Sequence, residues 1–414
     1  MSTTTSDTYV WTWLPDASEP VVAGRLEPRG PLQTFVYARS YRERPGAIPL
    51  YLPELPLRAG RLEPAAGLTA PGCILDARPD AWGQRVILNR LTGGQNWRDT
   101  DPGVLDLHTY LLESGSDRFG ALDFQTSSTA HVARGGATAT LEELLISAER
   151  VEQGVPLTPT LDAALLHGSS IGGARPKALL RDDGRHFIAK FPSSDDRYSV
   201  PRSEYVAMTL ARRVGLDVAP VRLVTALDRP VLLVERFDRS PGMTTRRHTV
   251  SALTILGLDE LQARWASYAD LAQVMRARFI RPRHTQHELF ARLVFNVLMG
   301  NTDDHARNHA AFWDGSQLSL TPAYDICPQL RSGGEASQGM AIGRDGYRLS
   351  SLAGCIARAA EFALTESEAR AIADHQRAVV ERDFEAVCDE ARLSAVDQQL
   401  LRRGSVLHPF ALGG

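Results

Sequence analysis

The chain holds a strong bias among its basic residues that singles out two lysines. It has 414 residues and 46 basic side chains, and only Lys177 and Lys190 are lysines. Arginine replaces lysine readily on a solvated surface, but not where a compact point charge is needed. Lys190 lies inside the strand-like run Phe187–Phe191. A strand lysine that contacts nucleotide phosphates, paired with Glu204 of the following helix, would serve phosphoryl transfer. The alternative is an exposed residue on an edge strand.

A polar loop farther along the chain carries residues suited to the same chemistry. Asp303 and Asn308 are five residues apart, and Asp325 follows 17 residues after Asn308. A carboxylate can accept the proton of a substrate hydroxyl, while an amide oxygen and a second carboxylate hold Mg²⁺. Each acidic residue alone would more often be a solvated loop residue or a helix cap. The ordered set favours phosphoryl transfer with ATP and Mg²⁺.

Two weaker patterns complete this set. Gly172 and Gly173 would let backbone N–H groups approach phosphate oxygens, although a glycine pair is more often a plain turn. The apolar run Val231–Val234 turns abruptly polar after Val234, which suits a hinge with backbone groups that bind adenine near Glu235–Phe237. A plain strand end explains this spacing equally well.

These residues require a small sheet and a largely helical region to position them. The predicted order is strand, strand, helix, strand, strand, followed by helices. The predicted elements of this part are Ala178–Arg181, Phe187–Phe191, a helix Ser203–Val214, Val221–Thr225, Val231–Val234, a helix Leu289–Met299 capped by Thr285 and Glu288, and strands Ala310–Trp313 and Leu318–Leu320. Thr365 with Glu368 predicts the start of a further helix.

The residues before this region predict a separate α/β subdomain. Strands are expected at Tyr9–Leu14 and Gln33–Ala38, and helices at Ala81–Leu91, 141–153 and 160–167. We predict a subdomain over 1–125, a linker and helix over 126–159, a sheet-bearing lobe over 160–240 and a helical lobe over 241–414. The fold class is therefore α+β, with two lobes and an extra N-terminal part.

Composition limits the possible partners and setting. The net charge of −3 gives no global attraction to nucleic acid or anionic membranes. No apolar run approaches 18 residues, so no membrane partner is expected. The four cysteines are scattered without a C-x-x-C pair, which favours a reducing cytoplasm.

Four motifs together resemble HipA-type serine/threonine kinases, the toxins of bacterial type II toxin–antitoxin modules. They are Gly-Ser-Ser-x-Gly-Gly-Ala-Arg-Pro-Lys at 168–177, Val-Glu-Arg-Phe-Asp-Arg at 234–239, Gly-Asn-Thr-Asp-Asp-His-x-x-Asn at 300–308 and Thr-Pro-Ala-Tyr-Asp-Ile at 321–326. The resemblance covers most of the chain and implies a protein-kinase-like, HipA-like fold with that family's N-terminal subdomain.

The resemblance also implies roles for individual residues. Asp303 would be the catalytic base, Asn308 and Asp325 would hold Mg²⁺, and Ser170, or its neighbour Ser169, would be autophosphorylated. A phosphate on Ser170 would place negative charge beside the ATP phosphates and inhibit the enzyme. The full set implied to bind ATP is Ser170, Gly172, Gly173, Ala174, Lys177, Lys190, Glu204, Glu235, Arg236, Phe237, Asp238 (near the ribose), His305 and Tyr324.

The resemblance further implies partners for the chain. These are a protein substrate such as an aminoacyl-tRNA synthetase, and a small helix-turn-helix antitoxin through which DNA would be reached indirectly. Asp304 departs from the small residue of some family members. No His-Arg precedes Asp303 and no Phe-Gly follows Asp325, so the activation-loop features of eukaryotic kinases are not expected.

Two other function classes stay open at this point. Asp303, Asp304, His305 and His309 form a dense group of potential ligands for a metal-dependent hydrolase, although Lys190 would then have no role. A binding module without catalysis that partners a repressor is the second. The arginines at 276, 278, 281 and 283 could contact DNA in such an assembly, but more often form a solvated helix face.

Overall fold

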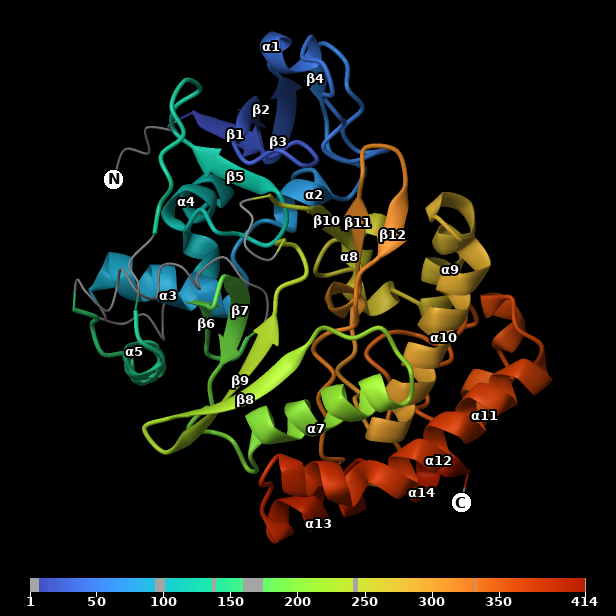
Figure 1. The fold of residues 1–414 in the computed structure, drawn as a ribbon. Helices are drawn as coiled ribbons and strands as arrows, with labels where there is room; N and C mark the ends of the chain where they lie inside the picture. The colour runs from blue at the N-terminus through green and yellow to red at the C-terminus, as the bar shows by residue number, and fades with distance from the viewer. Residues whose placement is uncertain are drawn as a thin grey trace. The chain divides into compact units, whose positions relative to one another are not determined.

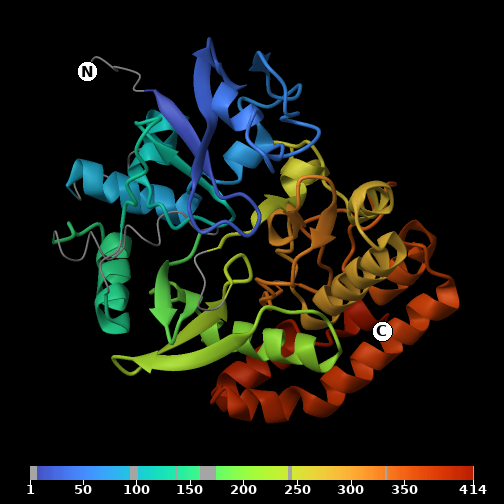
Figure 2. The same cartoon turned by 45° about the horizontal axis from the view of Figure 1, so that its top comes forward.

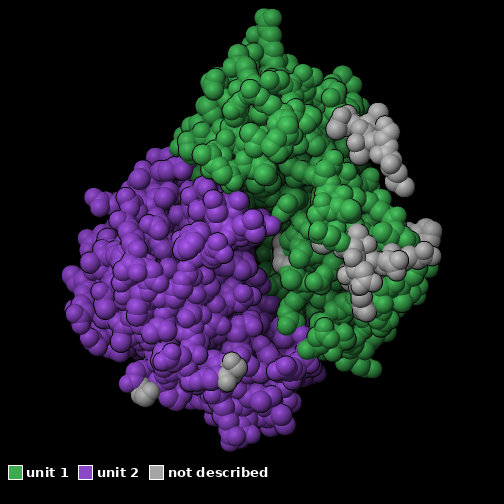
Figure 3. All heavy atoms as spheres, turned by 180° about the vertical axis from the view of Figure 1, so that it is seen from behind, with its two compact units in different colours: residues 1–195, 224–250, 313–316 green, residues 196–223, 251–312, 317–414 purple. Residues whose placement is uncertain are grey.

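The computed structural model describes residues 7–93, 101–135, 139–158, 174–240, 245–331 and 333–413 (Figure 1). These residues form two compact units, coloured separately in Figure 3. Unit 1 comprises 1–195, 224–250 and 313–316, and unit 2 comprises 196–223, 251–312 and 317–414. The mixture of helices and sheets confirms the predicted α+β class.

The N-terminal part of unit 1 is built on a five-stranded antiparallel sheet in the order β4-β3-β2-β1-β5. Its strands are β1 (Thr8–Thr12), β2 (Val21–Arg29), β3 (Leu32–Tyr37), β4 (Arg61–Leu62) and β5 (Leu122–Gln125). Val10, Phe35 and Phe124 are fully buried, so the apolar positions of these strands form a core. The predicted strands near Tyr9 and Gln33 are confirmed as β1 and β3.

A second, four-stranded sheet has the order β6-β7-β9-β8. Its strands are β6 (Lys177–Asp182), β7 (Arg185–Lys190), β8 (Val221–Ala226) and β9 (Arg229–Glu235). In unit 1, α3 (Ala81–Thr92) and α5 (Leu141–Gln153) share one buried core with this sheet. Trp82 of α3 is fully buried and donates its indole N–H to the Lys177 carbonyl over 2.9 Å. Helices α3 and α5 therefore support the strands that carry the two lysines.

Helices form most of unit 2 (Figures 1 and 2). Helix α10 (Pro282–Met299) packs against α9 (Tyr268–Arg278) and α12 (Glu366–Glu390), and α12 also packs against α7 (Val200–Arg213). Apolar side chains along α10 are fully buried, including Phe290, which lies 5.3 Å from the Phe362 ring. Helix α10 is therefore the central helix of this unit.

Shorter elements complete the described chain. A three-stranded sheet has the order β10-β11-β12, from β10 (His248–Ser251), β11 (Ala310–Trp313) and β12 (Leu318–Leu320). The remaining α-helices are α1 (Arg39–Arg42), α2 (Gly72–Leu75), α4 (Leu107–Glu113), α8 (Ala252–Ile255), α11 (Leu352–Ile356), α13 (Ala395–Gly404) and α14 (Pro409–Leu412). The 3₁₀ helices are η1 (Pro102–Val104), η3 (Ala263–Trp265), η4 (Ala306–Asn308) and η5 (Ala359–Phe362). No helix within the described residues is long and apolar enough to cross a membrane.

Two helix starts differ from the sequence-based expectation. Helix α7 begins at Val200 rather than near Ser203, because Pro201 is tolerated in a first helical turn. Helix α10 begins at Pro282, with Arg281 in a left-handed conformation before it, so the capping box of Thr285 is wrong. The Thr285 hydroxyl instead donates to the carbonyls of residues 280 and 281. The capping box predicted at Thr365 and Glu368 is confirmed at the start of α12.

The buried position of Phe290 gives a test of this core. We expect Phe290→Ala to lower the free energy of unfolding by about 3–5 kcal/mol, because it leaves a cavity in the central helix of unit 2. The matched control Val396→Ala removes methyl groups from a residue that is 68% exposed, and should change stability by less than about 0.5 kcal/mol. Denaturant titration of the full chain measures both changes. Equal effects of the two substitutions would contradict the packing.

Candidate active site

The two lysines are directly opposite each other in unit 1. Lys177 of β6 pairs with Lys190 of β7 in the antiparallel register, so their side chains leave the same face of the sheet. Strand β7 lies between β6 and β9, which excludes the edge-strand alternative for Lys190. Like charges placed directly opposite each other are unfavourable without anions nearby. Asp80 supplies one, with Oδ2 3.7 Å from the Lys177 Nζ. This arrangement suits the binding of a polyanion.

The predicted hinge follows directly from β9. Glu235 pairs with Phe187 across the β7–β9 ladder, and the Arg236 amide donates to the His186 carbonyl over 2.8 Å. The Arg236 amide is therefore engaged by the sheet. The half-buried Phe237 presents its ring edge-on to Phe119, with centroids 5.3 Å apart. The strand turns into a fixed, irregular segment at this point.

The side chains of Arg236 and Asp238 face the interior of unit 1. Asp238 is fully buried, and its two carboxylate oxygens accept hydrogen bonds from Arg236 Nε and an Arg236 terminal nitrogen over 3.0 and 2.7 Å. Arg239 and the Gly120 amide donate to Asp238 over 2.6 and 2.7 Å. Burial opposes the charge of Asp238, yet Arg236 and Arg239 keep its pKa below the usual range. The Asp238 carboxylate therefore acts as the centre of an internal ion-pair network.

In unit 2, residues at the two ends of the predicted catalytic loop contact each other. Asn308 ends the 3₁₀ helix η4 and is buried, and its Nδ2 lies 3.4 Å from the Asp303 carbonyl. The Asn308 amide donates to the His305 carbonyl over 2.8 Å. The side chains of Asp303 and His305 are exposed. The loop thus holds Asn308 inward and presents Asp303 outward, where it can meet a substrate.

Asp304, which sequence analysis considered only as a potential metal ligand, anchors this loop. Its Oδ2 accepts hydrogen bonds from Asn296 Nδ2 over 2.9 Å, from His309 Nε2 over 2.8 Å and from the Tyr268 hydroxyl. Asp304 is only 3% exposed. Burial, together with the Asp304 charge, raises the pKa of Tyr268 well above its ordinary value, so the phenol stays a donor. Asn301 also donates to the Asn296 side chain, which ties the start of the loop to α10.

Asp325 lies in an unusual backbone conformation beside this loop. Its φ of 59° falls in the left-handed region, which is uncommon for a non-glycine residue and is concentrated at functional sites. The preceding Tyr324 donates its hydroxyl to the Arg307 carbonyl over 2.7 Å. This bond fixes the Asp325 segment to the loop that carries Asn308. Two hard oxygen donors, an amide and a carboxylate, are the ligand type that Mg²⁺ uses together with phosphates.

The residues that the hydrolase interpretation treats as metal ligands make other contacts in the structure. Asp304 and His309 contact each other inside the anchor of the loop, and His305 is exposed. Across the described ranges, no group of three or more His, Cys, Asp or Glu side chains could hold a metal ion. Asn308 and Asp325 would supply only two ligands, an amide oxygen and a carboxylate, which are the donor types that magnesium uses when phosphates complete its coordination.

The other predicted site residues are placed as follows. Glu204 is buried on α7 in unit 2, in its second turn because α7 starts early. Ala174 is exposed just before β6. The predictions for Ser169, Ser170, Gly172, Gly173 and the helix 160–167 concern residues outside the described ranges. Asp117 and Tyr268 were missed by sequence reasoning, because both act through residues distant in the chain.

The anchor of the catalytic loop can be tested by stability. Asp304→Leu keeps the branched shape of the side chain but leaves three buried donors without their acceptor. We expect it to lower the free energy of unfolding by at least about 3 kcal/mol, since each of the three unsatisfied buried groups costs about 1–3 kcal/mol. The same substitution at the exposed neighbour, Asp303→Leu, should cost less than about 1 kcal/mol. Chemical denaturation compares the two variants, and similar losses would refute the anchoring role.

Comparisons with known proteins relate this chain to one family. The model of a family described as the HipA-like C-terminal domain matches residues 169–384, which is 216 of the 414 residues. The protein Y4mE of Sinorhizobium fredii is 32% identical over 147 residues, covering 34% of this chain and 33% of that protein. The serine/threonine-protein kinase toxin HipA of Shewanella oneidensis is 27% identical over 186 residues, covering 38% and 42%. The aligned segments therefore span less than half the length of either relative.

A solved structure extends the likeness to nearly the whole chain. The Shewanella oneidensis complex of HipA, HipB and operator DNA contains a chain with a TM-score of 0.66 and 19% identity to this one. The match covers 95% of this chain and 94% of that chain, and at this identity it shows the fold. Because the family model covers more than half of the residues, the chain belongs to the HipA-like C-terminal domain family, on a HipA-like α+β fold.

Proposed function

We propose that the chain is a serine/threonine protein kinase that uses ATP and Mg²⁺. The observation that carries the proposal is the closed loop of Asp303 and Asn308, tied through Tyr324 to Asp325 in its strained conformation. Phosphoryl transfer needs a positioned base and metal-binding oxygens more than covalent chemistry from the protein. The name of the Shewanella oneidensis relative, a serine/threonine-protein kinase toxin, supports the same activity.

Unit 1 would bind the nucleotide. The ammonium groups of Lys177 and Lys190 would neutralise phosphate charge, and Glu204 of unit 2 would serve as the ion-pair partner of Lys190. The Glu235 carbonyl and the Phe237 amide would bond to adenine, since the Arg236 amide is already used by β7. The buried Asp238 would support the hinge rather than bind the ribose. Residues 170–174, His305 and Tyr324 complete the predicted set of contacts.

Unit 2 would carry the transfer step. Asp303 would accept the proton of a serine or threonine hydroxyl as its oxygen forms a bond to the γ-phosphorus and the bond to the ADP oxygen breaks. Asn308 and Asp325 would hold magnesium, which when bound neutralises charge on the phosphates. Tyr324 would keep Asp325 in place through the Arg307 carbonyl. Products would be ADP and a phosphorylated protein.

The finer parts of the proposal concern regulation and partners. We extend it to autophosphorylation at Ser170 or Ser169 and to an aminoacyl-tRNA synthetase as substrate, on the basis of the family resemblance. The Shewanella oneidensis structure contains HipB and operator DNA. A small helix-turn-helix antitoxin is accordingly the expected partner here, with DNA reached only through it, in a cytoplasmic setting.

The role of Asp303 can be separated from nucleotide binding. Asp303→Asn should lower phosphate transfer from radiolabelled ATP to lysate proteins by at least about 100-fold, as expected for loss of a general base. The Kd for Mg·ATP should stay within about threefold. Asp374→Asn, at an exposed position of α12, is the matched control and should retain full transfer. ATP binding by the wild type without any magnesium-dependent transfer would instead identify a binding module or corepressor.

The two lysines can be tested through affinity for ATP. Lys177→Met and Lys190→Met should each raise the Kd for Mg·ATP about tenfold or more, because each removes a charge-assisted phosphate contact. Arg39→Met removes one positive charge from an exposed site of the same unit and should leave the Kd unchanged. Isothermal titration calorimetry provides the measurement. If all three variants bind ATP as tightly as the wild type, the phosphate site lies elsewhere.

A further inference from the structure

Two short segments of unit 1, more than a hundred residues apart in sequence, contact each other residue by residue. We call residues 117–120, Asp-Arg-Phe-Gly, the buttress, and residues 236–239, Arg-Phe-Asp-Arg, the hinge segment. The buttress lies between α4 and β5 of the N-terminal part, and the hinge segment follows β9. Every residue of each segment takes part in the contacts described below.

The first contact is an ion-pair cluster around Asp117. Its Oδ1 lies 3.0 Å from a terminal nitrogen of Arg236 and 2.8 Å from one of Arg239. The His186 Nδ1 lies 3.8 Å from the other carboxylate oxygen. Burial disfavours the charged form of Asp117, but the charge of Arg236, the hydrogen bond with His186 and the charge of Arg239 hold its pKa well below the ordinary value. Asp117 is therefore an anion at neutral pH and fixes both arginines of the hinge segment.

Backbone groups of the buttress add a second layer of contacts. The Arg118 carbonyl accepts hydrogen bonds from Arg236 and Arg239 over 2.7 and 2.5 Å. The Gly120 amide donates to Asp238 over 2.7 Å, and the Gly120 carbonyl accepts from Arg239 over 3.0 Å. A Cβ at Gly120 would lie 2.7 Å from the Thr249 hydroxyl, and the φ of Gly120 is +82°, so a side chain does not fit there. The two backbones are thus held at a fixed spacing.

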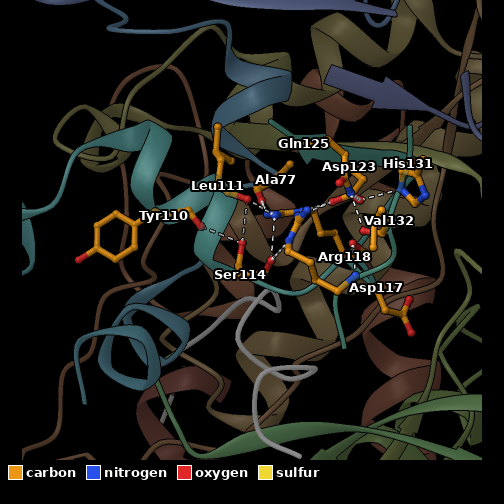
Figure 4. Close-up of polar contacts among 12 residues, drawn as sticks. Ala77, Tyr110, Leu111, Ser114, Asp117, Arg118, Asp123, Gln125, His131 and Val132 are labelled. Carbon is orange, nitrogen blue, oxygen red and sulfur yellow. Dashed lines mark hydrogen bonds and ion pairs between the residues drawn. The ribbon is translucent and has the colours of Figure 1, made fainter. Parts of the chain in front are cut away.

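The side chain of Arg118 ties the buttress to the rest of the N-terminal part. Figure 4 shows its guanidinium surrounded by carbonyls of Ala77, Leu111 and Ser114 and by the Asp123 carboxylate, whereas Asp117 extends away from this cluster. Arg118 is fully buried, and Asp123 also contacts His131 and Arg134 over 2.8 and 3.0 Å. The buttress is consequently fixed on both sides, with its Arg118 side chain in one cluster and its Asp117 side chain in the other.

An aromatic contact between the two segments lies beside the proposed adenine contacts. Phe119 of the buttress meets Phe237 edge-on, with centroids 5.3 Å apart. The two residues that flank Phe237, Arg236 and Asp238, are both held by the buttress, as described above. A shift of the buttress would therefore move the backbone on each side of Phe237, including the amide proposed to bond to adenine.

We propose that the buttress is a positioning element for the nucleotide hinge, so that the N-terminal part of the chain determines how well unit 1 binds the adenine base. Asp117 and Phe119 are positioning residues in this sense, because they act on the base through the hinge segment and do not touch the phosphates. This inference rests on the proposed function and adds to it a determinant of base affinity outside the sheet that carries the lysines.

The experiment compares two ligands on the full chain. Mg·ATP uses both the base contacts and the phosphate contacts, whereas inorganic tripolyphosphate with magnesium uses the phosphate contacts alone. Calorimetry on Asp117→Asn should show a Kd for Mg·ATP raised about tenfold or more, with the Kd for tripolyphosphate within twofold of the wild type. Phe119→Leu, a milder change, should raise the Kd for ATP about threefold and serves as the second variant if Asp117→Asn does not fold.

The matched control is Glu54→Gln. Glu54 is a half-buried carboxylate of the same unit that accepts hydrogen bonds from the Gly72 and Cys73 amides, outside both segments. It should leave both Kd values unchanged even if it lowers the melting temperature. Unchanged ATP affinity in a folded buttress variant, or equal losses for both ligands, would overturn the positioning role. A wild type that binds neither ligand would refute the proposed function itself, and the inference with it.

Discussion

A buried carboxylate must be fully supplied with hydrogen-bond donors, and this constraint shapes both segments on which the proposed function depends. Asp238 in unit 1 receives donors from Arg236, Arg239 and the Gly120 amide, and Asp304 in unit 2 receives them from Tyr268, Asn296 and His309. In each case the buried acid directly adjoins a residue assigned to ligand binding or chemistry. The interior acid fixes the backbone, so its neighbour, Phe237 or Asp303, is held without being buried itself.

In this arrangement, the charges that fix the backbone belong to other residues than the charges assigned to ligand binding and catalysis. Arg118 pairs with Asp123 in one buried cluster, where burial lowers the pKa of Arg118 to about 10, while Asp117 pairs with Arg236 and Arg239 in another and stays ionised. Among the charges assigned to chemistry, Asp303 and Lys190 lie at less buried positions, whereas Lys177 is buried beside Asp80. A buried ion pair contributes little net stability but is costly to break, so it specifies one backbone geometry more than it stabilises the fold.

Local patterns predicted much of the fold and part of the site. The four strands around Lys177 and Lys190 and the cap of α12 follow from alternation and capping residues, and the closure of the Asp303–Asn308 loop fits its spacing. The start of α10 was mispredicted because Thr285 carries a local capping signal, whereas tertiary burial places it inside the helix. Asp304 looked like a metal ligand because its donors are on other elements. The arginine partners of Asp117, Arg236 and Arg239, are more than a hundred residues away, and no spacing rule connects them.

The central claim is that the residues assigned to nucleotide binding, magnesium and proton transfer all respond to ATP with magnesium. Hydrogen–deuterium exchange of the full chain, with and without a non-hydrolysable ATP analogue and magnesium, tests it most directly. The account predicts slower amide exchange at residues 177–190, 235–239, 301–308 and 324–326 in the same titration, with one common midpoint. Protection confined to segments of a single unit, or absent from all four at millimolar nucleotide, would contradict it.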